Sequence, residues 1–135
     1  MDKTTLTRAV FDRLKAEFGA FCFVKDVRQK LTRNGSDELL ETCLKELLKD
    51  EGINTYNLRS TFVRRRLHHK KILLVLDDVD NFITAEGLIK ASAWFGEGSR
   101  LIITSRDIQM LNNTSASTTY RVLNGIPAMP FISLV

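Results

Sequence analysis

The chain is poor in metal-binding and thiol side chains, with two cysteines and two histidines among 135 residues. Cys22 and Cys43 both lie in apolar surroundings, which indicates buried free thiols and a reducing compartment. His68 and His69 are adjacent, so they lack the i, i+4 spacing that places two ligands on one helical face. The number of cysteines excludes a cysteine-rich zinc site.

Long apolar runs are also missing. No stretch approaches the roughly 18–20 residues of a membrane-spanning helix. The first residues, MDKTTLTRAVFDRL, carry charges where a signal peptide needs an apolar core. We therefore expect no membrane span and a cytoplasmic protein.

Charge of one sign is in small excess, at a net +4. Arg64–Arg66 and His68–Lys71 form a basic run at the end of an expected helix, where cations complement the helix dipole. No aromatic side chain interleaves with these charges, as one does in single-strand nucleic-acid binders. A solvated helix end is therefore favoured over a nucleic-acid partner.

What the chain does contain is a central stretch, Lys70–Asp80, with the sequence KKILLVLDDVD. Ile72–Leu76 is apolar without alternation, which is typical of a parallel strand buried on both faces. Asp77 and Asp78 follow it, at the edge where open α/β sheets bind ligands. This is the form of a Walker B strand, whose first acid holds Mg²⁺ and whose second polarises water. The alternative is a buried strand that ends in an ordinary polar turn.

Hydrophobic periodicity predicts alternating helices and strands. The expected helices are Thr4–Ala16, Asp37–Glu51, Leu58–Leu67 and a weak one at Phe82–Ala93, and the expected strands are Ala20–Val24, Ile72–Leu76 and Leu101–Thr104. Lys25–Arg28 is expected to be a polar turn. This order implies parallel pairing through right-handed crossovers, and hence an α/β fold with Asp77 at a carboxyl end.

The composition changes after Leu111. Asn112–Thr119 is rich in Asn, Ser and Thr, as in a loop or linker. Arg121–Val135 is apolar, contains both prolines and shows no period. We predict a domain over residues 1–111, followed over 112–135 by a linker and an unassigned apolar tail whose removal leaves the domain folded.

A short motif opens the first helix. Lys3-Thr4-Thr5 matches the end of a Walker A motif, in which the lysine reaches the phosphates and the next hydroxyl ligates Mg²⁺. The start of a helix adds amide donors and a favourable dipole. Alone the tripeptide carries little weight, because Thr is an ordinary helix cap. Asp77 follows at a distance that lets the chain return to the same edge of the sheet.

Four segments, in order and spacing, resemble the nucleotide-binding (NB-ARC) domain of plant disease-resistance proteins, which are intracellular immune receptors with leucine-rich repeats. They cover about Met1–Leu111 and read KTTLTRAVFDRL, FCFVKDVRQ, RRRLHHKKILLVLDDVD and WFGEGSRLIITSRD. Asp80, after LDDV, and the FCFVKDVR segment resemble the subgroup with an amino-terminal Toll/interleukin-receptor (TIR) domain. The fold implied is a P-loop NTPase-like parallel sheet flanked by helices.

The resemblance implies a switch that holds ADP at rest and exchanges it for ATP on activation, with Mg²⁺ as the metal cofactor. Lys3 would bind phosphate, Thr4 would ligate Mg²⁺ and Thr5 would approach the α-phosphate.

The resemblance also gives roles to residues at the ends of two strands. Asp77 would be the Mg²⁺-directed acid and Asp78 the catalytic, water-polarising one. Arg106 would be the sensor that reaches the terminal phosphate, since it is permanently charged and donates two parallel hydrogen bonds. Without the resemblance, Arg106 reads as an exposed turn arginine paired with Asp107.

The sequence departs from the family pattern at its start. The family motif follows a strand and a glycine-rich loop, whereas Met1 and Asp2 precede Lys3 here. We therefore expect a truncated receptor, a partial sheet that lacks the first strand and the glycine-rich loop, and impaired nucleotide binding. In the family that first strand lies beside the one matched by Leu101–Thr104, which is then expected to lack a hydrogen-bonding neighbour.

Three functions stay open from the sequence. The leading one is a fragment of an ADP/ATP-binding molecular switch in defence signalling, with adenine nucleotide as partner and at most slow ATPase activity. The second is a P-loop hydrolase of another family. The third is an interaction fragment that acts on a full-length immune receptor through its apolar tail, without nucleotide.

Overall fold

The structure is a computed structural model that describes residues 3–79, 86–104 and 131–134. The elements in chain order are α1 (Lys3–Leu14), β1 (Ala20–Val24), α2 (Val27–Asn34), α3 (Ser36–Leu48), α4 (Thr61–His68), β2 (Ile72–Leu76), α5 (Glu86–Ala91), β3 (Arg100–Thr104) and β4 (Phe131–Leu134). Single 3₁₀ turns, Lys15–Glu17 and Ser92–Trp94, follow α1 and α5. None of the helices in these ranges is long and apolar enough to cross a membrane.

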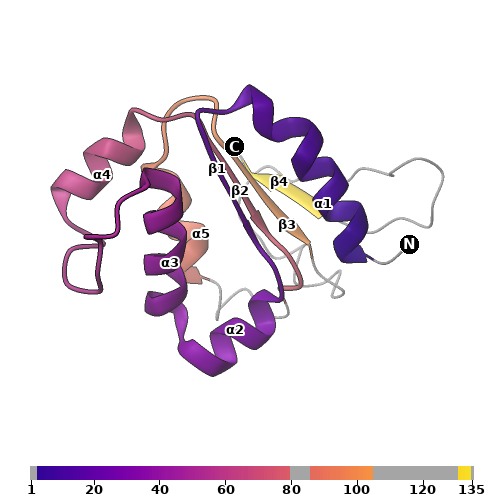
Figure 1. Cartoon of the computed structure of the whole chain (residues 1–135), viewed down its shortest axis with the longest axis horizontal. Coiled ribbons are helices and arrows are strands. Elements are labelled where there is room, and N and C mark those ends of the chain that lie inside the picture. Colours follow the sequence, from indigo (N-terminus) through magenta and orange to yellow (C-terminus); the bar gives the residue numbers. More distant parts are fainter. Residues whose placement is uncertain (1–2, 80–85, 105–130, 135) are drawn as a thin grey trace.

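The strands form one sheet in the order β1-β2-β3-β4. β1, β2 and β3 are parallel, with Val24 opposite Leu76 and Leu76 opposite Ile103. The predicted α/β fold is thus confirmed, and the parallel strands end at a common edge (Figure 1).

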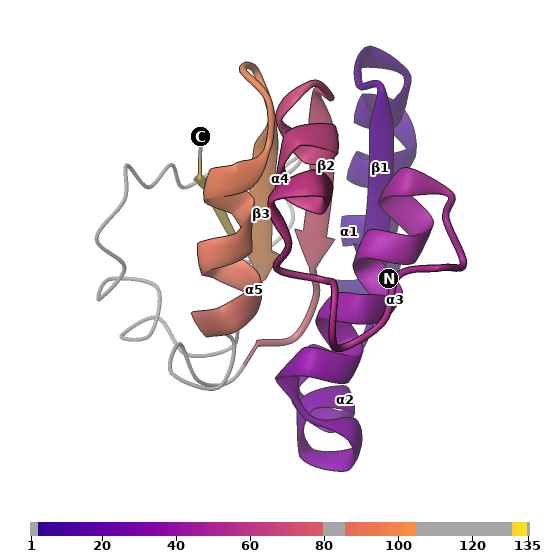
Figure 2. The same ribbon diagram turned by 90° about the vertical axis from the view of Figure 1, so that its left-hand side faces the viewer.

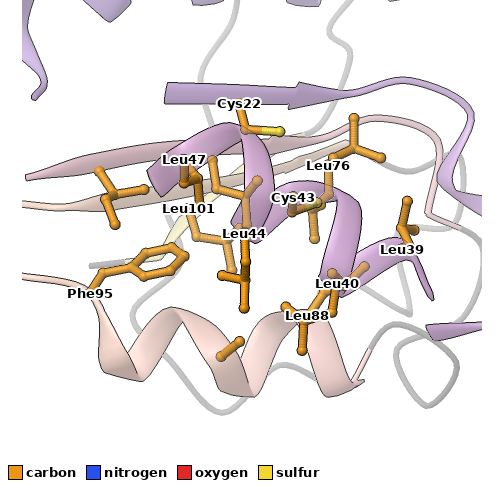
Figure 3. Packing of buried hydrophobic residues seen from close by; sticks show 14 of the residues in the cluster. Cys22, Leu39, Leu40, Cys43, Leu44, Leu47, Leu76, Leu88, Phe95 and Leu101 are labelled. Atoms are coloured by element: carbon orange, nitrogen blue, oxygen red, sulfur yellow. The ribbon is translucent and has the colours of Figure 1, made fainter. Parts of the chain in front are cut away.

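Helices cover both faces of the sheet (Figures 1 and 2). On one face, Phe11 of α1 packs in a cluster with the side chains of Leu73, Val75 and Ile102. On the other, α3 and α5 cover alternate residues of the same strands (Figure 3). Every residue of β2 is buried, because a strand covered on both sides has no face left for water.

The larger core lies between the sheet and α3. The leucines of α3 recur at helical spacing, and Leu44 is fully buried. Figure 3 shows this residue between the sheet and Leu88 of α5. The helix ends at Leu48 because Lys49 adopts a left-handed conformation with φ 51°. The helix predicted to reach Glu51 therefore ends earlier, at Leu48.

Two elements differ from the sequence predictions. Val27–Asn34 forms α2, where Lys25–Arg28 was expected to be a turn and no helix was expected to follow. Phe131–Leu134 forms β4, which pairs antiparallel with β3. The expectation that Leu101–Thr104 lacks a neighbour is therefore wrong, and part of the region assigned to a tail belongs to the sheet. The domain boundary at residue 111 lies outside the described residues and stays a prediction.

Candidate functional site

The acids predicted from the sequence lie at the carboxyl edge of the parallel strands. Asp77 and Asp78 follow β2 directly, between the ends of β1 and β3. α1 begins near the same edge (Figure 1). Ligands of open α/β sheets bind at such an edge, and a helix start contributes amide donors to anions.

Asp77 is almost completely buried, with 2% of its surface exposed. Its Oδ1 accepts a hydrogen bond of 2.7 Å from the hydroxyl of Thr104 at the end of β3. Its backbone N–H donates to the carbonyl oxygen of Val24 at 2.9 Å, which extends the pairing of β1 and β2 by one residue. Both neighbouring strands therefore hold this residue in place.

Asp78 adopts a left-handed conformation with φ 62°. Its backbone N–H donates to Thr104 Oγ1 at 3.0 Å, and its carboxylate lies 3.7 Å from the Arg28 guanidinium. The Asp78 side chain is 21% exposed and that of Arg28 is 44% exposed, so solvent screens this ion pair. The acid predicted to polarise water is the more accessible of the two.

The start of α2 also fixes the backbone of the acidic turn, the residues Asp77–Val79 that follow β2. The N–H groups of Val27 and Arg28 donate to the carbonyl oxygens of Asp77 and Asp78, at 2.9 and 3.0 Å. The first N–H groups of a helix lack partners within it, and here the turn after β2 accepts two of them. This tie explains why a helix starts directly after β1.

The other predicted site residues are described only in part. Lys3, Thr4 and Thr5 form the first turn of α1, and the Thr5 side chain is exposed. The side chains of Lys3 and Thr4, and the whole of Arg106, lie outside the described residues. The structure thus brings the helix start and both acids to one edge, while the roles of these side chains stay predictions.

The carboxylate oxygens of Asp77 and Asp78 suit a cation that a bound ligand also coordinates. No cluster of three or more His, Cys, Asp or Glu side chains that could hold a metal occurs among the described residues. Mg²⁺ is commonly held by one or two carboxylates together with water and substrate phosphate. Asp77 and Asp78 fit that pattern and do not fit a closed structural metal site.

Thr104 and Arg28 are the contacts that sequence reasoning missed. Arg28 was assigned to a turn, and Thr104 was read only as the last residue of a strand. The signal for Thr104 was a hydroxyl residue at the end of an apolar run, with acids at the end of the neighbouring run. Only the register, with Leu76 opposite Ile103, aligns Asp77 with Thr104.

Together, the parallel sheet, its helical layers and its acidic carboxyl edge define a partial α/β domain of the P-loop NTPase type. The family model of the NB-ARC domain matches residues 1–124. The chain belongs to the NB-ARC family, and the fold and family inferred from its motifs are confirmed.

Several relatives of this chain are disease resistance proteins of plants. Disease resistance protein RRS1 of Arabidopsis thaliana is 39% identical over 120 residues, which cover 89% of this chain and 8% of the relative. Disease resistance protein RRS1B of the same plant is 36% identical over 135 residues, covering 98% and 10%. Disease resistance protein RUN1 of Vitis rotundifolia is 33% identical over 123 residues, covering 89% and 9%. The chain thus spans a tenth or less of these relatives.

Proposed function

We propose that this chain is the nucleotide-binding segment of an ADP/ATP switch in a plant intracellular immune receptor. The observation that carries the proposal is the acidic edge after β2, where Asp77 is buried and hydrogen-bonded to Thr104. Membership of the NB-ARC family and similarity to disease resistance proteins support it. We extend the proposal to a cytoplasmic location and to the TIR-containing subgroup.

At the helix start, Lys3 would bind phosphate, Thr4 would ligate Mg²⁺ and Thr5 would approach the α-phosphate. The cation would bring these phosphate oxygens together with the Asp77 carboxylate. The amide groups of the first turn of α1 would add donors to the anion.

At the strand ends, Asp77 would be directed to Mg²⁺ and Asp78 to an attacking water molecule. Arg106 would read the terminal phosphate. The proposed switch would hydrolyse ATP slowly at most, and Arg28 would lie 3.7 Å from its water-directed acid.

We further propose that residues 1–135, taken by themselves, bind adenine nucleotide weakly. Met1 and Asp2 supply none of the glycine-rich amides that surround phosphate in a Walker A loop, and Asp2 places a negative charge beside Lys3. Since β4 already pairs with β3, this weakness rests on the phosphate loop alone and not on an unpaired strand.

Titration calorimetry with ADP and Mg²⁺ tests the proposal on two chains. The first is the native chain, and the second has a family-type strand and glycine-rich loop added before Lys3, with Asp2→Gly. A family-type strand would need the β3 edge that β4 occupies, so the second chain is made with and without Phe131–Leu134. We expect the extended chain to bind ADP and the native chain to bind more weakly than micromolar.

Variants of the extended chain show whether the proposed site is used. Lys3→Ala should abolish ADP binding, whereas Lys15→Ala, which removes a lysine from the far end of the same helical segment, should not. Micromolar binding by the native chain would refute the claim of weak binding. A folded extended chain that fails to bind would refute the nucleotide site itself.

Of the alternatives, the family match excludes a P-loop hydrolase of another family. An interaction fragment without nucleotide remains a proposal, with a full-length immune receptor as its partner. It was expected to act through the apolar tail, and the pairing of Phe131–Leu134 with β3 reduces the part of that tail available to a partner.

A further inference from the structure

A buried hydroxyl group lies at each end of β3. Ser99 directly precedes the strand, and Thr104 is its last residue. At the amino end, Ser99 Oγ accepts from the Ile72 N–H at 2.8 Å and donates to the Lys70 carbonyl oxygen at 3.3 Å. At the carboxyl end, Thr104 Oγ1 accepts from the Asp78 N–H at 3.0 Å and donates to Asp77 Oδ1 at 2.7 Å. Both hydroxyl groups tie β3 to β2, but only that of Thr104 donates to a carboxylate.

The hydroxyl of Thr104 has a single proton, and the geometry decides where it points. Because the Asp78 N–H occupies a lone pair of Oγ1, the proton is directed to the carboxylate of Asp77. Thr104 and Asp77 are 3% and 2% exposed, so water competes poorly for this bond. A charge-assisted bond in such surroundings limits the rotation of the carboxylate.

The geometry points to Thr104 as a positioning residue for the Asp77 carboxylate at the cation site, an inference that rests on the proposed function. Groups that orient a ligating carboxylate by hydrogen bonding affect metal affinity although they do not touch the metal. Thr104 does this from β3, whereas Asp77 belongs to the turn after β2. The affinity for the cation therefore depends on the junction between the two strands.

The backbone of Thr104 strengthens this dependence. Its carbonyl oxygen accepts from the Val79 N–H at 2.9 Å, so one residue holds the side chain of Asp77 and the N–H groups of Asp78 and Val79. A shift at the end of β3 would move the whole acidic turn. This makes Thr104 a link through which events at the end of β3 reach the cation site.

The competing explanation is that Thr104 only joins two strands, as Ser99 does. Three variants separate the two explanations. Thr104→Val keeps the shape and removes the hydroxyl, Thr104→Ser keeps the hydroxyl, and Ser99→Ala removes the matched hydroxyl at the opposite end of β3.

The first measurement follows metal binding without any added nucleotide. Mn²⁺ is added as a stand-in for Mg²⁺, and broadening of the Asp77–Val79 amide signals is followed by NMR in the native chain. We expect broadening in the native chain and in Thr104→Ser and Ser99→Ala, and a 10- to 100-fold weaker response in Thr104→Val. Amide exchange at Asp78 should also speed up in Thr104→Val alone.

The second readout is the Mg²⁺ dependence of ADP affinity in the extended chain described above. Thr104→Val should need about tenfold more Mg²⁺ for half-saturation, with Thr104→Ser close to the parent. Ser99→Ala should lower the unfolding temperature without changing the Mg²⁺ requirement.

Two results would overturn the inference: an equal Mn²⁺ response in Thr104→Val and the native chain, or an equal loss in Ser99→Ala. Absence of Mn²⁺ broadening in the native chain would overturn it too. If Mn²⁺ behaves as expected and no extended chain binds ADP, the nucleotide function fails while the role of Thr104 stands.

Discussion

Cys22 and Cys43 show how burial controls the chemistry of single residues in this fold. Cys22 comes from β1 and Cys43 from α3, and 2% and 1% of their surfaces are exposed. The Cys22 thiol donates to Glu46 Oε2 at 3.2 Å. The hydrogen bond with Cys43, burial and the nearby Glu46 carboxylate together raise the pKa of Cys22 far above the usual range of a thiol.

This raised pKa predicts slow alkylation of the native protein. Only the thiolate reacts, and each unit of pKa above the working pH lowers its fraction about tenfold. At pH 8, iodoacetamide should label Cys22 on the order of a hundredfold more slowly in the native chain than in urea. Labelling followed by peptide mass spectrometry measures both rates. Equal rates would show that the thiol is accessible and normally acidic.

At the scale of elements, Arg66 joins α4 to the end of α3. Its Nη1 donates to Asp50 Oδ2 at 2.6 Å, and its Nη2 donates to the Leu48 carbonyl oxygen at 3.4 Å. The hydrogen bond from Arg66, together with the Gly52 N–H, lowers the pKa of Asp50 below the ordinary value of a carboxyl group. Arginine near the last carbonyl of a helix also complements its dipole.

The lowered pKa of Asp50 predicts the sign of a pH effect. A carboxyl group whose folded pKa is depressed stabilises the protein above its unfolded pKa of about 3.9, and this contribution disappears as pH falls through the folded value. Arg66→Ala should therefore lower the melting temperature at pH 7 by a few degrees and have a smaller effect near pH 3. Arg65→Ala, an exposed arginine on the same helix, should change little at either pH. A pH-independent loss in Arg66→Ala would contradict the electrostatic explanation.

At the scale of the whole molecule, the fourth strand, β4, attaches residues 131–134 to β3 of the sheet. β4 covers the edge of β3 with Leu101 opposite Leu134 and Thr104 opposite Phe131. Residues 101–104 are buried, and Thr104 carries the contacts of the acidic turn. Their hydrogen-bonding groups would otherwise face an open sheet edge.

Removal of residues 131–135 should therefore destabilise the fold, in contrast to the expectation from composition. We expect a loss on the order of 1–3 kcal/mol in urea unfolding, the cost of leaving strand groups without partners. Amide exchange in Leu101–Thr104 should speed up. The double variant Ile132→Pro/Ser133→Pro, which removes two neighbouring strand N–H groups of which one faces β3, should have the same effect in the 135-residue chain. Unchanged exchange in both variants would show that β4 contributes nothing to the sheet.

Sequence alone determined the elements whose cause is local. The unbroken apolar run at Ile72–Leu76 is buried on both faces as predicted, since such a run has no polar side to expose. The leucines of α3 lie inward because their spacing matches the helical repeat. The parallel order then places Asp77 and Asp78 at the carboxyl edge, because connections between parallel strands return the chain in the same direction.

Only the tertiary structure decided which distant groups meet. The sequence of α2 is polar and buries only Val27, and its start is held by carbonyl groups some fifty residues further along the chain. β4 lacks a hydrophobic period, yet an open strand edge provides hydrogen-bonding partners that composition does not reveal. The bond between Thr104 and Asp77 depends on the register of two strands. A periodic pattern in the sequence indicates which side chains are buried, whereas strand register and strand pairing depend on how the sheet and its helical layers pack together.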